Sequence, residues 1–334
     1  MGEAAENVLP FAVGDDSPRT IVARASAADR IYRGVLRAAG ITVLAITGLI
    51  LAFLILQAWP ALRAEGFRLL TTGAVDPGGN HFGVAVLLPD SALVAVVALV
   101  IAIPAGFGAA LFISEYAPAR LRQPLIAVVD VLAAIPSIVF ALWGLIFLMP
   151  RIIGLDAWLG HHLGFIPVFR IQPHASPTDL VGSTFIAGVV VSMMVLPIII
   201  SLSRQVFSQA PQGEREAAYA LGSTRWGMVR TVVLPFGRAG MIGASMLGLG
   251  RALGETIAVS FILTLSPLFN YRTLEGGGNS ITAEIANNVF VFDAGGRSFL
   301  IAAGLILFAT TLVINALASI VVSRSRSGAT TQSD

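Results

Sequence analysis

An arginine and a glutamate lie four residues apart in a stretch that is otherwise apolar and rich in glycine. The stretch reads Gly-Leu-Gly-Arg-Ala-Leu-Gly-Glu-Thr and ends at Thr256, and its two charged members are Arg251 and Glu255. Residues four apart share one face of a helix, so the two charges can form an ion pair. An arginine at the bilayer centre costs about 3 kcal/mol on insertion scales, so it should face the protein interior or a wet cavity. Such a guanidinium can bind and release an anion.

Two interpretations of this pair remain open from spacing alone. In the first, a permanent salt bridge between Arg251 and Glu255 only keeps both charges tolerable in the membrane. In the second, Arg251 exchanges Glu255 for an anionic substrate during transport. Asp130, in another apolar stretch, makes the charge count less suited to an anion. It can instead pair with a cytoplasmic arginine or bridge to a neighbouring subunit. Gly250 and Gly254 have the spacing that lets a second helix approach closely.

The composition places these charges in a membrane protein. Hydrophobic residues make up 56% of the 334 residues and charged residues only 12%, a balance typical of membrane-embedded chains. Six apolar stretches are long enough to span a bilayer as helices. The predicted fold is therefore an all-α membrane protein with six transmembrane helices. The stretches run over residues 38–58, 91–113, 124–149, 180–202, 239–265 and 299–322.

The first apolar stretch could be either a signal peptide or a retained helix. The first stretch lies too deep in the chain, and lacks a clear small-residue cleavage site, for a typical signal peptide. It is therefore interpreted as a retained helix.

Pro104, Pro136 and Pro197 lie within the second, third and fourth stretches, where each removes a backbone hydrogen bond. Rigid kinks are the preferred interpretation; the alternative is that they shape a cavity that opens and closes.

The arginines set the expected orientation. If the N-terminus is cytoplasmic, the inside segments carry fourteen arginines and the outside segments six. Since cytoplasmic loops carry an excess of basic residues, both termini and the loop over 204–238 are predicted to be cytoplasmic. The expected domains are an N-terminal tail over 1–37, a six-helix membrane domain over 38–323 and a C-terminal tail over 324–334.

Two residue types are missing from the sequence. There is no cysteine, and all 21 basic residues are arginine. A standard P-loop requires lysine, so this chain cannot carry one, and any ATP that drives it is hydrolysed by another polypeptide. Disulfides and thiolate metal sites are excluded. His161 and His162 are adjacent and do not converge on one helix face, so no metal or cofactor is expected in this chain.

A polar loop over residues 205–235 is predicted to form a helix, a turn and a second helix. Pro211 suits the first turn of the first helix, where its missing N–H costs nothing. Gly222 lies where this helix should stop and a positive φ angle is needed. Ser223 or Thr224 can cap the second helix, and Pro235 is expected to end it. The apolar face of the second helix is predicted from three residues at helical spacing: Trp226, Val229 and Val233.

The same loop carries a longer pattern. Glu216-Ala217-Ala218 is followed by three residues and Gly222, and then by nine residues and Val232-Val233-Leu234-Pro235. This pattern resembles the EAA loop of ABC-importer permeases, with Val232 in place of the consensus isoleucine. The resemblance implies that the loop docks on a separate ATP-hydrolysing subunit; the alternative is an ordinary amphipathic surface loop. The implied coupling residues are Glu216, Ala217, Ala218, Gly222, Leu234 and Pro235.

The stretch that contains Arg251 and Glu255 is similar to the fifth-span signature of phosphate importer permeases. Other stretches resemble the PstC-type subunit of that family, and together they cover residues 31–323. These stretches are Phe112-Ile113-Ser114-Glu115-Tyr116-Ala117-Pro118, Val131-Leu132-Ala133-Ala134-Ile135-Pro136-Ser137 and Leu142-Trp143-Gly144. The resemblance implies a type I ABC-importer permease fold in a bacterial plasma (inner) membrane. The implied substrate pathway contains Arg251, Glu255, Thr256 and Ser137.

The resemblance also implies partners. They are a homologous PstA-type permease, two copies of an ATP-binding subunit that holds ATP and magnesium, and an extracytoplasmic phosphate-binding protein. No nucleic acid is implied. The long second external loop favours the PstC type over the PstA type.

Other functions remain as alternatives. A sulfate or molybdate permease is the nearest, because the coupling loop is shared among such importers. A stand-alone ion-coupled transporter or channel would also suit six spans with a buried Arg–Glu pair, although it needs no docking loop. A membrane enzyme is not favoured, because the chain lacks a convincing in-membrane Ser-His, paired-Asp or His-Glu set.

Overall fold

The computed structural model describes residues 27–71, 75–76, 81–266 and 270–326. Helices account for almost all of them, so the predicted all-α fold is confirmed, with one addition. Two short strands, β1 (Val75–Asp76) and β2 (His81–Phe82), pair in antiparallel fashion. The helices are α1 (Ala27–Glu65), α2 (Arg68–Thr71), α3 (Leu87–Leu111), α4 (Ala119–Ala134), α5 (Ser137–Trp143), α6 (Met149–Leu163), α7 (Thr184–Ser208), α8 (Gln212–Ala220), α9 (Arg225–Met228), α10 (Leu234–Leu253), α11 (Ile257–Ile262), α12 (Ile281–Asn288) and α13 (Ala294–Arg326).

Several of these helices continue into shorter turns of other types. Three are π-helical: η1 (Phe112–Tyr116) extends α3, η2 (Gly144–Leu148) joins α5 to α6, and η5 (Val229–Val233) joins α9 to α10. Two are 3₁₀ turns, η3 (Pro167–Phe169) and η4 (Pro177–Leu180), in the segment between α6 and α7.

The chain divides into two compact units, Met1–Leu51 and Ala52–Asp334. In the first unit the described residues are the beginning of α1, whose apolar side chains, such as Leu44 and Leu49, are exposed. After Arg37 this part of α1 carries no charged residue, and an apolar helix surface of this kind suits lipid. The domain limits expected at residues 37 and 323 remain predictions, and residues 1–26 and 327–334 lie outside the described part of the chain.

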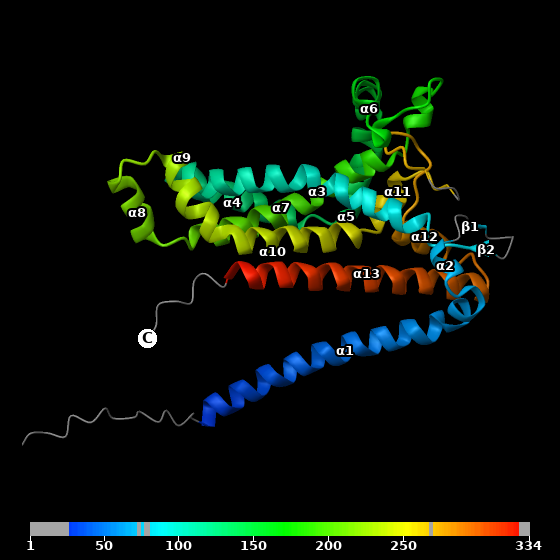
Figure 1. The fold of residues 1–334 in the computed structure, drawn as a ribbon, viewed down its shortest axis with the longest axis horizontal. Coiled ribbons are helices and arrows are strands. Elements are labelled where there is room, and N and C mark those ends of the chain that lie inside the picture. Colours follow the sequence, from blue (N-terminus) through cyan, green and yellow to red (C-terminus); the bar gives the residue numbers. More distant parts are fainter. Residues whose placement is uncertain (1–26, 72–74, 77–80, 267–269, 327–334) are drawn as a thin grey trace, which may run out of the picture. The chain divides into compact units, whose positions relative to one another are not determined.

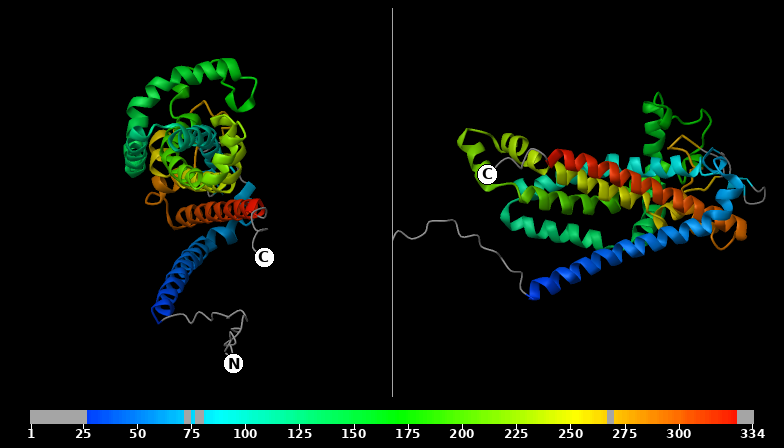
Figure 2. Two further views of the ribbon diagram at one scale, coloured as in Figure 1. Left: turned by 90° about the vertical axis from the view of Figure 1, so that its left-hand side faces the viewer. Right: turned by 60° about the horizontal axis from the view of Figure 1, so that its bottom comes forward.

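The second unit is built around α7. Six segments of the described chain are long and apolar enough to cross a membrane, as predicted. In the apolar 18-residue stretch of α7, 61% is buried inside the protein, against 28% or less in the corresponding stretches of the other five segments. This makes α7 the central helix, with α3, α4 and α10 packed against it and α13 packed against α10 (Figure 1). Figure 2 gives an end-on view of the same helices in its left panel.

The third span differs from its prediction. α4 ends before Ile135 and Pro136, which are extended with ψ angles of 128° and 140°, and α5 begins only after them. The proline cannot donate a hydrogen bond and pushes the residue before it out of the helical region, so the chain breaks here instead of kinking. The segment apolar enough to span is Ser137–Leu163, not residues 124–149. The other two predicted kink sites lie inside uninterrupted helices: Pro104 in α3 and Pro197 in α7.

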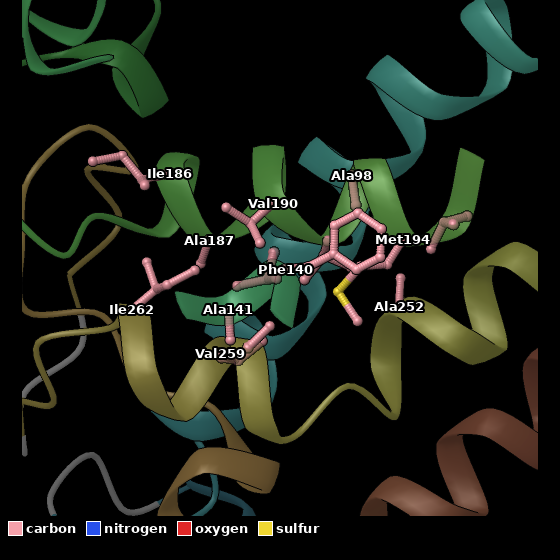
Figure 3. Close-up of a cluster of buried hydrophobic side chains, with 14 of the residues drawn as sticks. Ala98, Phe140, Ala141, Ile186, Ala187, Val190, Met194, Ala252, Val259 and Ile262 are labelled. Atoms are coloured by element: carbon pink, nitrogen blue, oxygen red, sulfur yellow. The ribbon is translucent and has the colours of Figure 1, made fainter. Parts of the chain in front are cut away.

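A buried hydrophobic cluster holds the helix that follows this break. Phe140 of α5, Met194 of α7 and Val259 of α11 meet in it, together with small residues of α3 and α10 (Figure 3). α5 and α11 also pack against each other. Burial of each large side chain contributes about 1.5–3 kcal/mol. The cluster therefore fixes α5 and α11, two short helices that could not be stable alone.

One glycine of α7 lets α3 approach closely. A Cβ atom on Gly188 would lie 2.5 Å from Cγ1 of Val97 and 3.2 Å from the carbonyl oxygen of Val94. We expect Gly188→Ala to destabilise the folded chain by roughly 1–3 kcal/mol, the usual cost of overpacking. Thermal unfolding of the detergent-purified variant measures this loss.

Gly108 of α3 supplies the matched control. A Cβ atom built there meets nothing within 4 Å, so Gly108→Ala should keep or raise the unfolding midpoint, since alanine is the better helix former. Equal midpoints for the two variants would contradict the close contact between α3 and α7.

Candidate functional site

The predicted charge pair lies at a break in the fifth span. α10 ends at Leu253, and Gly254, Glu255 and Thr256 separate it from α11. The expectation of one continuous helix over 239–265 is therefore wrong, because the chain leaves the helix at Gly254. The ion pair itself is confirmed: Nη2 of Arg251 lies 3.8 Å from Oε2 of Glu255. This distance is too long for a hydrogen bond, so the contact is a Coulomb attraction alone.

The two members of the pair have different surroundings. The side chain of Glu255 is 6% exposed and that of Arg251 is 47% exposed. Oε1 of Glu255 accepts a hydrogen bond from the backbone N–H of Ala258 at 3.4 Å, which caps the first turn of α11. Its carbonyl oxygen accepts another from the hydroxyl of Thr282 at 2.8 Å. Glu255 is thus fixed by the fold, whereas the Arg251 guanidinium can meet an anion without losing a hydrogen bond.

Polar contacts from α3 hold the helix that carries Thr282. The backbone N–H of Asn279 donates to Oδ2 of Asp90 at 2.8 Å, and that of Ile281 donates to the hydroxyl of Ser91 at 3.0 Å. The buried Glu284 accepts from the side-chain amide of Asn279 at 2.9 Å. Burial raises the pKa of Glu284, while its hydrogen bonds oppose the shift. No motif in the sequence indicated this support, since its members lie up to 190 residues apart.

The other predicted pathway residues lie at the two breaks. The hydroxyl of Thr256 donates to the carbonyl oxygen of Gly254 at 3.3 Å. Ser137 is the first residue of α5, directly after the break in the third span, and is half-buried. Because α5 packs against α11, the two breaks belong to neighbouring elements. The substrate role of all four predicted residues remains a prediction.

Of the expectations about neighbours of the pair, the close helix contact at Gly250 and Gly254 is not met within the described chain, and the role of Asp130 stays open. Gly250 has open space where a Cβ would stand, and a Cβ on Gly254 would meet only the carbonyl oxygens of Gly250 and Arg251, so none of the described helices packs on them. The close approach to α7 occurs instead at Gly248, whose Cβ would lie 2.9 Å from Cγ1 of Val195. Asp130 is exposed on α4, and the ion pairs among the described residues do not include it. A bridge from Asp130 to another subunit remains a prediction.

The predicted helix, turn and helix of the polar loop are confirmed. α8 ends in a turn at Gly222, which has the predicted positive φ of 82°. Thr224 caps the second helix by accepting from the N–H of Gly227 at 3.1 Å. Figure 1 shows α8 and α9 together at one end of the second unit, with α12 at the opposite end.

Three details of the loop differ from expectation. Pro211 is the residue before the first turn, in extended conformation with ψ of 131°. Pro235 does not end the second helix, because the π-helical turn η5 comes directly before it and the helix continues as α10. In a π turn the backbone hydrogen bonds join residues five apart instead of four. This shift lets the helix continue past a proline, which has no N–H to donate. Trp226 is 56% exposed and so does not share the buried face of Val229 and Val233.

The predicted coupling residues are mostly on the surface. Glu216, Ala217 and Gly222 are exposed, and Ala218 is buried against the rest of the hairpin. Leu234 is half-buried and Pro235 exposed at the start of α10. Large apolar side chains are exposed beside them, namely Tyr219, Leu221 and Trp226. An exposed apolar group rimmed by polar residues is typical of a protein-interaction surface.

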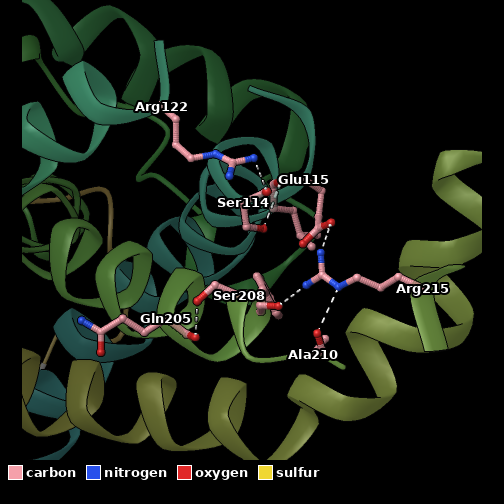
Figure 4. A network of polar contacts seen from close by, with 9 residues as sticks. Ser114, Glu115, Arg122, Gln205, Ser208, Ala210 and Arg215 are labelled. Atoms are coloured by element: carbon pink, nitrogen blue, oxygen red, sulfur yellow. Dashed lines mark hydrogen bonds and ion pairs between the residues drawn. The ribbon is translucent and has the colours of Figure 1, made fainter. Parts of the chain in front are cut away.

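A buried ion pair that no sequence motif indicated lies next to this surface. Nη1 of Arg215 lies 2.8 Å from Oε2 of Glu115, and the two side chains are 20% and 4% exposed. The guanidinium also donates to the carbonyl oxygens of Phe207 at 2.6 Å and Ala210 at 3.2 Å (Figure 4). Glu115 is part of a stretch quoted above for its resemblance, but nothing in the sequence linked it to an arginine 100 residues later.

The described chain thus combines six segments able to span a membrane, a charged pair at a break in one of them and an exposed helical hairpin. The chain belongs to the family described as "Binding-protein-dependent transport system inner membrane component", whose model matches residues 102–327.

Two curated relatives extend the match beyond the family model. The chain is 42% identical over 294 residues to "Phosphate transport system permease protein PstC 2" of Mycobacterium tuberculosis, covering 87% of this chain and 90% of the relative. It is 42% identical over 270 residues to "Phosphate transport system permease protein PstC" of Mycobacterium leprae, covering 80% of this chain and 84% of the relative. The predicted resemblance to PstC-type permeases is therefore confirmed.

A solved structure supports the fold. A chain of "a bacterial ABC transporter involved in the import of the acidic polysaccharide alginate" matches with a TM-score of 0.50 and 16% identity, covering 88% of this chain and 99% of that one. At this identity the likeness concerns the fold alone, and it agrees with the predicted ABC-importer permease architecture.

Proposed function

We propose that this chain is the PstC-type permease subunit of an ATP-driven, binding-protein-dependent phosphate importer in a bacterial inner membrane. The observation that carries the proposal is the 42% identity to a mycobacterial protein named as a phosphate transport permease, over nine-tenths of that protein's length. The chain catalyses no chemical step and holds no cofactor. ATP and magnesium bind to a separate ATPase subunit.

Arg251 is the proposed contact for phosphate. Its half-exposed guanidinium lies at a break in a membrane span and is attracted to Glu255 without a hydrogen bond. A phosphate oxyanion offers stronger, bidentate hydrogen bonds to an arginine fork. Phosphate therefore displaces the weak contact with Glu255, and Glu255 takes Arg251 back when the anion leaves. Thr256 and Ser137 line the same pathway.

The hairpin of α8 and α9 is the proposed ATPase-docking surface. Glu216, Ala217 and Gly222 are exposed beside large apolar side chains, which suits a partner protein better than water. ATP binding in the partner pulls this hairpin, tilts the spans and opens the pathway outward. ATP hydrolysis then returns the inward-facing state.

The other proposed partners meet this chain within the membrane and on the extracytoplasmic side. A homologous PstA-type permease completes the pathway within the membrane, and two ATP-binding subunits serve the two permeases. An extracytoplasmic phosphate-binding protein delivers the anion to the segments between the spans. These segments surround a cavity of about 550 Å³ lined by polar residues that include Gln172, Asp179 and Glu275.

Phosphate uptake tests the proposal. Cells that lack their own high-affinity phosphate importer would express this chain with its neighbouring subunits, and uptake of labelled phosphate and sulfate would be compared. We expect phosphate-selective uptake that disappears when the ATP-binding subunit is omitted. Uptake of sulfate or molybdate instead would assign the chain to another oxyanion, and uptake without the ATP-binding subunit would indicate a stand-alone transporter.

A further inference from the structure

The contacts of Arg215 join the coupling hairpin to η1, to the end of α7 and to the link that follows α7. Its guanidinium pairs with Glu115 in η1 and donates to the carbonyl oxygen of Phe207 in α7 and to that of Ala210 after α7. On the other side of η1, Nη2 of Arg122 in α4 donates to the carbonyl oxygen of Ser114 at 3.0 Å. In Figure 4, Arg215 and Arg122 both reach η1, at Glu115 and Ser114 respectively. One side chain of α8 is thus bound to the ends of both α3 and α7.

These contacts are distinct because the rest of α8 packs within its own hairpin. The helix lies against α9 and η5, and Ala218 is its buried residue. Arg215 is the long side chain that reaches past the hairpin. The three acceptors lie in different directions, and the guanidinium fork can serve all of them because it carries five N–H donors.

The pair depends on both of its members. Glu115 is 4% exposed, and its second oxygen, Oε1, has no hydrogen-bond partner among the described residues. The charge of Glu115 is therefore compensated by Arg215. Since uncompensated buried charges are strongly disfavoured, η1 and α8 are expected to move together.

We propose that Arg215 is a positioning residue that transmits displacement of the coupling hairpin to α3 and α7 through Glu115 and the end of α7. The inference rests on the proposed function, because it assumes that an ATPase moves the hairpin. α7 is the central helix of the second unit and α3 packs directly on it. A displacement of α8 therefore reaches η1 and α3 through this contact, whereas without it the hairpin would be joined to the membrane domain mainly by its backbone links to α7 and α10.

The first test measures coupling in the whole complex. The chain, its partner permease and the ATP-binding subunits would be reconstituted in proteoliposomes with the phosphate-binding protein. We expect Arg215→Gln to lower phosphate imported per ATP hydrolysed by roughly 5- to 150-fold, the range of coupling between distant sites. The ATP-binding subunit should still co-purify, because the exposed docking residues are unchanged. Arg120→Gln, which removes an exposed arginine at the start of α4, should leave the ratio unchanged.

The double variant Glu115→Gln/Arg215→Gln separates transmission from simple structural support. Arg215→Gln alone leaves a buried carboxylate uncompensated, so the unfolding midpoint of the complex should fall. The double variant removes both charges and should restore much of that midpoint. Its phosphate-to-ATP ratio should stay low, because the links to η1 and to the two carbonyl groups remain lost.

The outcomes are distinguishable from failure of the proposed function. A wild-type complex that imports no phosphate would defeat the proposed function itself. A wild type that is coupled, with a double variant whose coupling recovers along with its stability, would overturn the inference and reduce the pair to structural support. Unchanged coupling in Arg215→Gln would overturn it as well.

Discussion

Arg251→Gln is expected to reduce phosphate uptake by about 10- to 100-fold, the effect of losing hydrogen bonds to a charged group worth about 1.5–3 kcal/mol. Glutamine keeps a polar side chain that can donate a hydrogen bond, but it is shorter than arginine and offers no charge and no fork. The measurement is uptake of labelled phosphate at matched membrane levels of the complex.

Arg238→Gln is the matched control for this substitution. Arg238 lies on the same helix, α10, and is exposed near the start of that helix. Its replacement should leave uptake near that of the wild type. If Arg251→Gln also transports normally, the pair with Glu255 only keeps two charges tolerable in the membrane.

Glu255→Gln should change the kinetics of phosphate uptake in a different way from Arg251→Gln. An amide oxygen can still accept from the N–H of Ala258, so the cap of α11 is expected to survive. The competitor for Arg251 is lost, and phosphate should bind more tightly but leave more slowly. Both KM and the maximal rate of uptake should therefore fall together. A fall in complex yield with unchanged KM would instead indicate a purely structural role for Glu255.

Gly222→Val is expected to separate ATP hydrolysis from transport or to prevent docking of the ATPase. Gly222 has φ of 82° and ends α8. A β-branched residue in that conformation costs about 1–3 kcal/mol of strain, so the turn should open and displace the exposed residues of the hairpin. Co-purification of the ATP-binding subunit and phosphate imported per ATP measure the effect.

Asparagine at the same position provides the control. It tolerates a positive φ angle far better than valine does, so Gly222→Asn should retain docking and most of the coupled transport. Equal loss with both substitutions would mean that a side chain here clashes with the partner, and the turn conformation would not be the cause.

The apolar stretches and the hairpin were predictable because both depend on residues that are close together in the sequence. Six spans follow from runs of apolar residues, and the turn follows from Gly222 and the cap at Thr224. The breaks at Pro136 and Gly254 were missed because hydropathy counts side chains and ignores backbone hydrogen bonds. Pro235 was expected to end the second helix, but the π turn η5 accommodates it and the helix continues.

The supports of the site were not predictable. The pair of Arg215 and Glu115 and the bond between Asn279 and Asp90 join residues 100 or more positions apart. Such contacts depend on tertiary packing, and one sequence does not reveal which distant residues meet. The pair of Arg251 with Glu255 was found because its members are neighbours on the chain, although the structure ends α10 at Leu253, before Glu255.

The exposure of Leu221 has a practical consequence for labelling chemistry. This side chain is 88% exposed at the end of α8, and the sequence contains no cysteine. A thiol introduced by Leu221→Cys would be the only one in the chain, so a maleimide dye could label it specifically and no native cysteine would have to be removed first. Protection of that thiol by a bound ATPase would give a fluorescent record of docking.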